Sequence, residues 1–159
     1  MCTVVQILEK SKEANKEIWI AAVDYTKAFD SVEHASIWQA LREQGVPDNY
    51  VTLLKNLYKK HMGQVIADKN SKEFDITRGV KQGDPLSTLL FNALLEKIFR
   101  STKSEWYQKG YGIEIAPRNG EMLTNIRFAD DVLLFAGSEE QMRDMMNKLS
   151  KESAKTNIV

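Results

Sequence analysis

Cysteine and long apolar runs are scarce in this 159-residue sequence. Its one cysteine, Cys2, cannot form a disulfide within the chain, and no set of cysteines and histidines has the spacing of a zinc site. No run reaches the ~20 apolar residues that a membrane helix needs, and the N-terminus lacks the apolar stretch and cleavage site of a signal peptide. We therefore expect a soluble protein without a membrane partner, located in the cytoplasm, the nucleus or both.

The sequence also lacks an excess of charge, since 22 Lys and Arg residues balance 22 Asp and Glu residues. A protein that binds nucleic acid on its own normally shows a basic excess or a basic stripe. Global electrostatics alone is therefore not expected to hold a nucleic acid. Residues 49–67 contain no acid, and their aromatic and basic residues include Lys55, Tyr58, Lys59, Lys60 and His61. A solvated helix end is the simpler interpretation of this segment.

Apolar periodicity divides the chain into alternating helices and strands. Helices are predicted at 3–15, 32–41, 48–57, 86–99 and after Ser138, and strands at 19–23, 63–68, 73–79, 113–115, 123–128 and 132–135. The uninterrupted apolar run at 19–23 is typical of a strand buried on both faces, inside a sheet. Because long helices alternate with strands, and short turns join the later strands, we expect an α+β fold with a mostly antiparallel sheet in a single domain, 1–159.

Local signals mark where several helices begin. Asp48 is expected to cap the third helix. Asp84 followed by Pro85 is typical of a cap and a first helical turn, because proline loses no needed N–H there. Ser138 and Gln141 predict a capping box for the last helix.

Two adjacent acids, Asp130 and Asp131, lie between the apolar runs IRF and VLLF. The simplest geometry is a β-hairpin whose tight turn displays both carboxylates. Aspartate favours turns in general, so the turn alone explains most such residues. Two adjacent acids at a buried turn repel each other, however, unless a cation neutralises them. The pair is therefore a candidate metal site.

A third acid, Asp24, ends the apolar run at 19–23, where an unpaired charge inside a sheet is costly. It could instead turn outward to water or cap the following helix. If its strand lies beside the 126–135 hairpin, Asp24 converges with Asp130 and Asp131. Carboxylate oxygens suit Mg²⁺ or Mn²⁺. Two such ions about 3.5–4 Å apart stabilise the attacking and leaving oxygens in phosphoryl transfer.

The segment TRGVKQGDPLSTLLF leads into the expected buried helix. Gln82 and Gly83 immediately precede that helix, where backbone N–H groups point outward and glycine permits a close approach. An ordinary turn before a helix explains the same pattern. Arg78 and Lys81 are residue types that are more often solvated than functional.

The segments AAVDYTKAFDSV, RGVKQGDPLSTLLFNALLE and IRFADDVLLFA follow the order and approximate spacing of the three palm motifs of reverse transcriptases. The forms AFDSV, RGVKQGDPLS and FADD most resemble the enzymes of non-LTR (LINE-type) retrotransposons. The resemblance runs from about residue 16 to about 150, with the motifs at about 20–32, 78–96 and 126–136. It implies a palm-centred fragment of a reverse transcriptase domain, with a mostly antiparallel sheet packed with helices, incomplete fingers and no thumb.

The resemblance also implies a metal site. In that family the acids that match Asp24, Asp130 and Asp131 ligate two catalytic metal ions, so two Mg²⁺ or Mn²⁺ ions are implied here. The residue that matches Tyr25 offers its backbone carbonyl to one of them.

A nucleotide site is implied as well. Phe29 matches the aromatic residue beneath the incoming sugar, which excludes a ribose 2′-hydroxyl, although a core phenylalanine gives the same sequence pattern. Gln82 and Gly83 match the pair that contacts the incoming nucleotide and the template. Thr88 stands where many members of the family have proline.

The implied reaction is the attack of a DNA primer 3′-hydroxyl on the α-phosphate of a dNTP, with RNA as the template. The basic fingers segment and the thumb have no counterpart in this sequence. The fragment is therefore expected to be inactive on its own and to need those regions of its parent polyprotein.

Two other functions would use the same carboxylates. A two-metal nuclease shares the ions, but Phe29 and the Gln82–Gly83 turn argue against it, because a nuclease has no incoming dNTP to select. The other alternative is a non-catalytic palm relic that acts as a binding scaffold. The presence of all three acids favours past catalysis without proving present catalysis.

Overall fold

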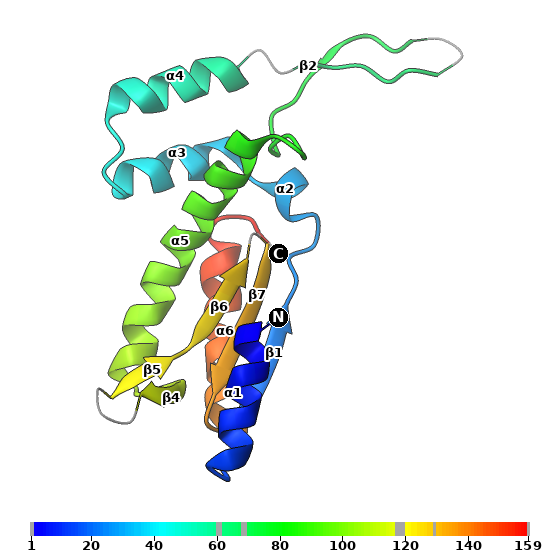
Figure 1. The fold of residues 1–159 in the computed structure, drawn as a ribbon. Coiled ribbons are helices and arrows are strands. Elements are labelled where there is room, and N and C mark those ends of the chain that lie inside the picture. The colour runs from blue at the N-terminus through cyan, green and yellow to red at the C-terminus, as the bar shows by residue number, and fades with distance from the viewer. Residues whose placement is uncertain (1, 60–61, 68–69, 117–119, 129, 159) are drawn as a thin grey trace. The chain divides into compact units, whose positions relative to one another are not determined.

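The structure is a computed structural model that describes residues 2–59, 62–67, 70–116, 120–128 and 130–158 (Figure 1). The helices are α1 (Cys2–Glu13), α2 (Ala28–Ser31), α3 (His34–Glu43), α4 (Asp48–Tyr58), α5 (Pro85–Gln108) and α6 (Glu139–Ala154). The strands are β1 (Trp19–Val23), β2 (Met62–Gly63), β3 (Phe74–Asp75), β4 (Ile113–Ala116), β5 (Glu121–Leu123), β6 (Asn125–Phe128) and β7 (Asp131–Ala136).

These elements form two compact units. The first unit consists of Met1–Tyr25 and Phe99–Glu152, and the second of Thr26–Ile98 and Ser153–Val159. Every pairing between the named strands is antiparallel, as the sequence predicts. No helix in the described part of the chain is both long and apolar enough to cross a membrane.

The first unit is built on a three-stranded sheet in the order β1-β7-β6. The central strand β7 pairs with β1 as far as Val23↔Val132 and with β6 as far as Phe128↔Asp131. Only two residues separate β6 from β7, so the expected tight hairpin is confirmed. The hairpin and the end of β1 therefore meet at one end of the sheet.

β1 is an edge strand of this sheet, so the expectation that its apolar run lies inside the sheet is wrong. Its residues alternate between half-buried and exposed, and Ile20 is 37% exposed. The interior position belongs to β7, in which residues 132 and 134–136 are buried. A short apolar run does not show whether its strand is central or at an edge, because that depends on which strands pair on either side.

Helices cover one face of the sheet (Figure 1). Strand alternation places residues 132, 134 and 136 of β7 on this face, and all three are buried. The guanidinium group of Arg127 in β6, which pairs with Val132, lies 4.6 Å from the ring centre of Phe99 in α5. α6 adds the buried residues Met142, Met145 and Leu149. These buried residues therefore lie on the face opposite Asp131, while buried Phe135 of β7 lies on the Asp131 face.

Exposed ion pairs join the end of α5 to α6. Lys109 Nζ lies 2.7 Å from the Asp144 carboxylate and 3.0 Å from that of Glu105. The Tyr111 hydroxyl also donates to Asp144, at 2.9 Å. The hydrogen bonds from Lys109 and then Tyr111 hold the pKa of Asp144 below its usual range. Because these side chains are largely exposed, solvent screening keeps their contribution to stability small.

Asp144→Asn is expected to lower the free energy of unfolding slightly at pH 7. Because the folded-state pKa of Asp144 is depressed, its stabilising effect is present above the usual carboxyl pKa and is lost as the pH falls through the folded-state value. Urea unfolding of both proteins from pH 7 downward would show the difference shrinking below about pH 4. A difference that persisted undiminished at the lowest pH would contradict an ionic origin.

The second unit contains α2, α3, α4, the first part of α5 and the β2–β3 hairpin. Asp84 Oδ1 accepts the backbone N–H of Leu86 at 2.9 Å, so the expected cap before Pro85 is confirmed. The expected cap at Asp48 is wrong, because Pro47 holds the extended N-cap conformation and Asp48 is already helical. The Asp48 carboxylate instead accepts a hydrogen bond from Arg42 Nε at 2.7 Å.

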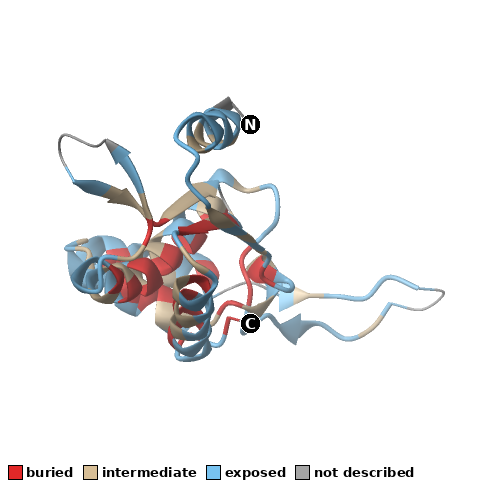
Figure 2. Ribbon diagram, turned by 90° about the horizontal axis from the view of Figure 1, so that it is seen from below, coloured by how far each residue is buried: buried red, intermediate tan, exposed pale blue. Residues whose placement is uncertain are grey.

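Several other boundaries differ from the sequence prediction. β2 and β3 are shorter than the expected strands at 63–68 and 73–79, and residue 68 lies outside the described part. The described residues of this hairpin are mostly exposed (Figure 2). Between them Ser71 bonds to Val65 through both its hydroxyl and its backbone N–H, in place of a longer ladder. The expected strand at 123–128 is divided into β5 and β6 at Thr124. α5 continues to Gln108, beyond its expected end at 99.

The expected capping box of α6 forms in part. The Ser138 hydroxyl accepts the backbone N–H of Gln141 at 3.3 Å. The Gln141 side chain accepts from the backbone N–H of Gly137 at 3.1 Å, one residue earlier than a capping box requires. The backbone N–H groups of Gly137 and Gln141 therefore both have a hydrogen-bond partner.

Candidate functional site

The end of the β6–β7 hairpin displays two of the three predicted acids. Asp131 is the first residue of β7 and pairs with Phe128, the last residue of β6. Asp130 lies in the turn and is half-buried, and Ala129 beside it is outside the described residues. The sequence folds this way because short apolar strands flank residues that favour tight turns.

Asp24 reaches the same end of the sheet from the other side of β7. Because Val23 pairs with Val132, continuing the antiparallel register places Asp24 opposite Asp131. Paired residues of antiparallel strands share one face, so Asp24, Asp131 and Phe128 lie on the face opposite buried Val132. Phe128 is 81% exposed. Asp24, which directly follows β1, and Phe128, the last residue of β6, therefore lie at the same end of the sheet as Asp131.

The three carboxylates at this end of the sheet have no cationic partner among the described residues. None of the carboxylates of Asp24, Asp130 and Asp131 forms a hydrogen bond or ion pair with a residue that the structure describes. Neighbouring carboxylates without a cation repel each other. Among the described residues, no three His, Cys, Asp or Glu side chains come together as a ready metal-ion cage. The strand before Asp24 therefore lies beside the hairpin, whereas the three carboxylates are not gathered around a common point in the described residues, and their convergence stays a prediction.

This donor set fits a divalent metal ion. The three acids offer hard oxygen atoms that no described side chain occupies, and Mg²⁺ is usually held by one or two carboxylates together with water and substrate phosphates. Mg²⁺ sites therefore rarely need a complete cage of protein ligands. Asp24 directly follows Val23, and Asp131 directly precedes Val132, so the last pair of this ladder brings these two acids to the same end of the sheet.

Tyr25 and Phe29 follow Asp24 along the chain and are both packed. Tyr25 is buried at 6% exposure and ends the first unit. Phe29, in α2 of the second unit, stacks on Phe91 of α5 with ring centres 4.9 Å apart and an interplanar angle of 29°. The packing expected of a core phenylalanine is therefore present. Phe29 is half-buried as a residue, so it is not fully enclosed.

Two backbone hydrogen bonds join the loop before α5 to the segment around α2. The backbone N–H of Val80 donates to Phe29 O at 2.7 Å, and that of Gly79 donates to Val32 O at 2.8 Å. Gly79 has φ +83°, and a Cβ added there would lie 2.9 Å from Asp30 O. Only glycine allows this approach of one backbone to another.

Gln82 and Gly83 follow the residues of the loop, Gly79 and Val80, that form these hydrogen bonds. Both are exposed, and Gly83 has φ +82° with open space around it, since a Cβ added there would have no atom within 4 Å. Gln82 belongs to the second unit with Phe29, whereas all three acids belong to the first unit. Each half of the predicted site is thus assembled within its own unit.

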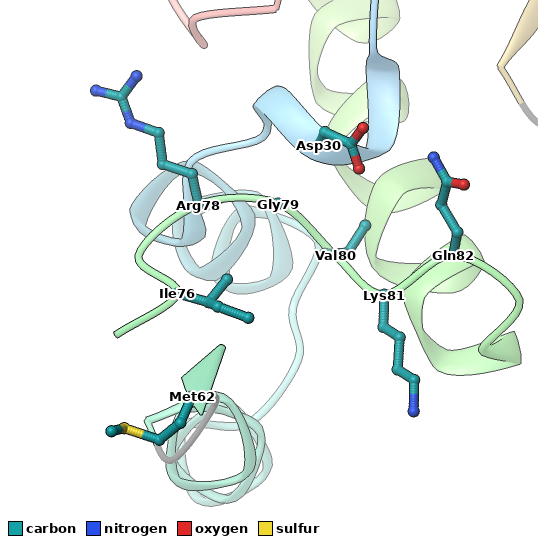
Figure 3. A pocket seen from close by; sticks show the side chains of 8 residues that line it. All are labelled: Asp30, Met62, Ile76, Arg78, Gly79, Val80, Lys81 and Gln82. Atoms are coloured by element: carbon teal, nitrogen blue, oxygen red, sulfur yellow. The ribbon is translucent and has the colours of Figure 1, made fainter. Parts of the chain in front are cut away.

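A pocket of about 650 Å³ opens beside this loop (Figure 3). Figure 3 shows the backbone of residues 78–82 running between Asp30 on one side and Met62 and Ile76 on the other. The remaining lining residues are Arg78, Gly79, Val80, Lys81 and Gln82. The lining therefore combines an acid, an amide and an apolar wall with two basic residues, of which Arg78 is paired with Glu33 at 3.4 Å.

Sequence reasoning did not identify Asp30, Met62 and Ile76 as pocket residues, nor the close approach at Gly79. Of these residues, only Gly79 could have been noticed in the sequence, because a positive φ or a close backbone contact often requires glycine. In the basic segment at 49–67, Lys55 is half-buried, Lys59 is exposed, and Lys60 and His61 lie outside the described residues.

Comparison with known proteins gives a consistent result. The family described as reverse transcriptase (RNA-dependent DNA polymerase) matches residues 1–159. The chain is 37% identical over 144 residues, 89% of its length, to the Retrovirus-related Pol polyprotein from type-2 retrotransposable element R2DM of Drosophila melanogaster. It is 32% identical over 146 residues, 90% of its length, to the Retrovirus-related Pol polyprotein from type-1 retrotransposable element R2 of Nasonia vitripennis. It spans 13% of each of these relatives.

Among solved structures, apo telomerase from Candida tropicalis, truncated from its C-terminal domain, shares the fold with a TM-score of 0.66. The match covers 93% of this chain and 30% of the telomerase chain at 12% sequence identity. At this identity the likeness concerns the fold alone, and it confirms the α+β fold class expected from the sequence.

Proposed function

The chain belongs to the reverse transcriptase (RNA-dependent DNA polymerase) family, and from this we propose that it forms the catalytic palm of an RNA-directed DNA polymerase. The observation that supports the proposal is the end of the three-stranded sheet, where Asp24 follows the last β1–β7 pair, Val23↔Val132, and Asp131 ends the β6–β7 ladder. The parent element is proposed to be a non-LTR retrotransposon, because the similar polyproteins carry the names of R2 elements.

Asp24, Asp130 and Asp131 are proposed to hold two Mg²⁺ or Mn²⁺ ions. When bound, such ions stabilise the negative charge that develops on the attacking and leaving oxygens. The contribution of the chain is to fix the acids on a rigid sheet end and to leave them without competing hydrogen bonds from the described residues. The backbone carbonyl of Tyr25, next to Asp24, is proposed to contact one ion.

The second unit is proposed to receive the nucleotide. In the pocket beside residues 78–82, Lys81 is proposed to meet phosphate charge, since Arg78 is paired with Glu33, and Gln82 lines the pocket with Gly83 next to it in the chain. The half-buried ring of Phe29 is proposed to lie beneath the sugar of the incoming dNTP. Its stacking on Phe91 would hold the ring rigid, as a steric filter requires.

RNA template and DNA primer are the proposed macromolecular partners. The chain has no net charge, so we propose that other regions of a longer polyprotein supply much of the contact with the nucleic acid backbone. The isolated chain is accordingly proposed to be inactive in primer extension.

A chimera tests this function. The segment of the Drosophila R2DM polyprotein that aligns with this chain is replaced by the chain itself, and extension of a DNA primer on an RNA template is measured with dNTPs and Mg²⁺. Extension is expected. A folded chimera without extension would refute the proposal, and cleavage of nucleic acid without dNTPs, lost on Asp24→Asn, would indicate a two-metal nuclease instead.

Phe29→Ala in this chimera is expected to raise incorporation of ribonucleotides relative to deoxyribonucleotides by about tenfold or more, because a missing side chain no longer excludes the 2′-hydroxyl. Phe29→Leu keeps much of the volume and the packing on Phe91, so it should discriminate nearly as the original does. Unchanged discrimination in Phe29→Ala would show that this residue is only part of the core.

A further inference from the structure

His34 lies outside every motif that the proposed function uses, yet it touches the loop that carries Gln82. Its Nε2 lies 2.7 Å from the backbone carbonyl oxygen of Gly79. Because a carbonyl oxygen can only accept, Nε2 carries the proton and donates. His34 is the first residue of α3, so its backbone position is set by that helix.

This hydrogen bond completes the attachment of Gly79. The N–H of Gly79 is held by Val32 O and its carbonyl by His34, while Arg78 forms an ion pair with Glu33 at 3.4 Å. The Arg78 pair is exposed and adds little. The His34 bond attaches the loop backbone itself, one residue before the Val80 N–H that donates to Phe29 O.

The imidazole ring is itself held in place. It packs edge-on against the Tyr58 ring with centres 5.2 Å apart and lies 6.2 Å from the Trp38 ring. Tyr58 is buried, and its hydroxyl forms a 3.2 Å hydrogen bond with Ser87 Oγ in the first turn of α5. The same aromatic cluster therefore contacts the chain on both sides of residues 81–84: at Gly79 through His34 and at Ser87 through Tyr58.

We infer that His34 is a positioning residue, which holds the backbone of residues 79–83 in the orientation that presents Gln82 and Gly83 to the nucleotide. The inference rests on the proposed function. His34 itself touches no proposed ligand and acts only through the Gly79 carbonyl. Residues 81–83 are exposed, so their placement depends on the attachments at either end.

Two substitutions separate the hydrogen bond from the packing. His34→Phe keeps a ring against Tyr58 but has no donor, whereas His34→Gln keeps an N–H donor at a similar reach but has no ring. Hydrogen exchange of this chain is measured for the peptides covering residues 78–84 and 36–43. We expect His34→Phe to speed exchange in 78–84 by about fivefold, the loss of one hydrogen bond, with 36–43 unchanged and with His34→Gln close to the original.

Unchanged exchange in 78–84, or equal acceleration of both peptides, would overturn the inference. In the chimera, His34→Phe is expected to raise the KM for dNTP about fivefold with kcat within twofold, and His34→Gln to restore it. A loss of kcat at unchanged KM would also overturn it. An inactive unsubstituted chimera would refute the proposed function, while the exchange experiment would still decide the role of His34.

Discussion

Asp130→Asn is expected to reduce primer extension by the chimera at least about a thousandfold, because electrostatic stabilisation of the reacting oxygens contributes about this much in comparable sites. The substitution is nearly isosteric and lies in a two-residue turn, so the strands β6 and β7 should pair unchanged. The rate of nucleotide addition at saturating Mg²⁺ and dNTP is the quantity to compare.

Asp144→Asn is the matched control, because it makes the same chemical change on the exposed side of α6. It should leave extension near that of the original. Retained extension in Asp130→Asn would refute the metal assignment. Binding of Mn²⁺ by the isolated chain gives a second measurement: it should disappear in the Asp130→Asn, Asp131→Asn double variant, and equal binding by both folded chains would point to a palm relic without a metal site.

Gly79→Ala is expected to lower the free energy of unfolding by about 3 kcal/mol, because a positive φ costs alanine about 1–2 kcal/mol and overpacking typically adds about 1–3 kcal/mol. The added Cβ would lie 2.9 Å from Asp30 O and 3.1 Å from Asp30 Cα, which are backbone atoms that cannot rotate away. Urea unfolding of the isolated chain measures the change.

Gly83→Ala is the control for backbone conformation. Gly83 has nearly the same φ as Gly79, +82° against +83°, but no atom lies within 4 Å of its added Cβ. It should therefore cost only about 1–2 kcal/mol, the strain of the left-handed conformation. Equal destabilisation by the two substitutions would show that the contact with Asp30 relaxes without cost.

The sequence predicted the parts of this fold that depend on local chemistry. The two-residue hairpin before Asp131 follows from apolar runs on either side of a turn, and the start of α5 follows from a cap and a proline. The edge position of β1 could not be predicted, because it depends on which strands pair in space. The prediction that Asp48 caps α4 was wrong for a local reason, because Pro47 is the N-cap residue of that helix.

The candidate site shows the same division. The convergence of the Asp24 and Asp131 backbones depended on strand neighbours that the sequence left open, and the register places them opposite each other. The contact between Gly79 and Asp30 joins residues 49 positions apart in the sequence, and neither residue type indicates its partner. The pocket likewise requires Met62 and Ile76 from a hairpin whose placement no local pattern indicates.

The 24-residue helix α5 contributes residues to both compact units, and this affects how each unit unfolds. Its residues 85–98 belong to one compact unit and its residues 99–108 to the other, within a single unbroken helix. Helix formation is cooperative, so melting one half exposes an end that frays the other. A ligand that stabilises the folded form of one unit is therefore expected to slow the fraying of the half of α5 that belongs to the other, which hydrogen exchange of residues 85–108 would measure.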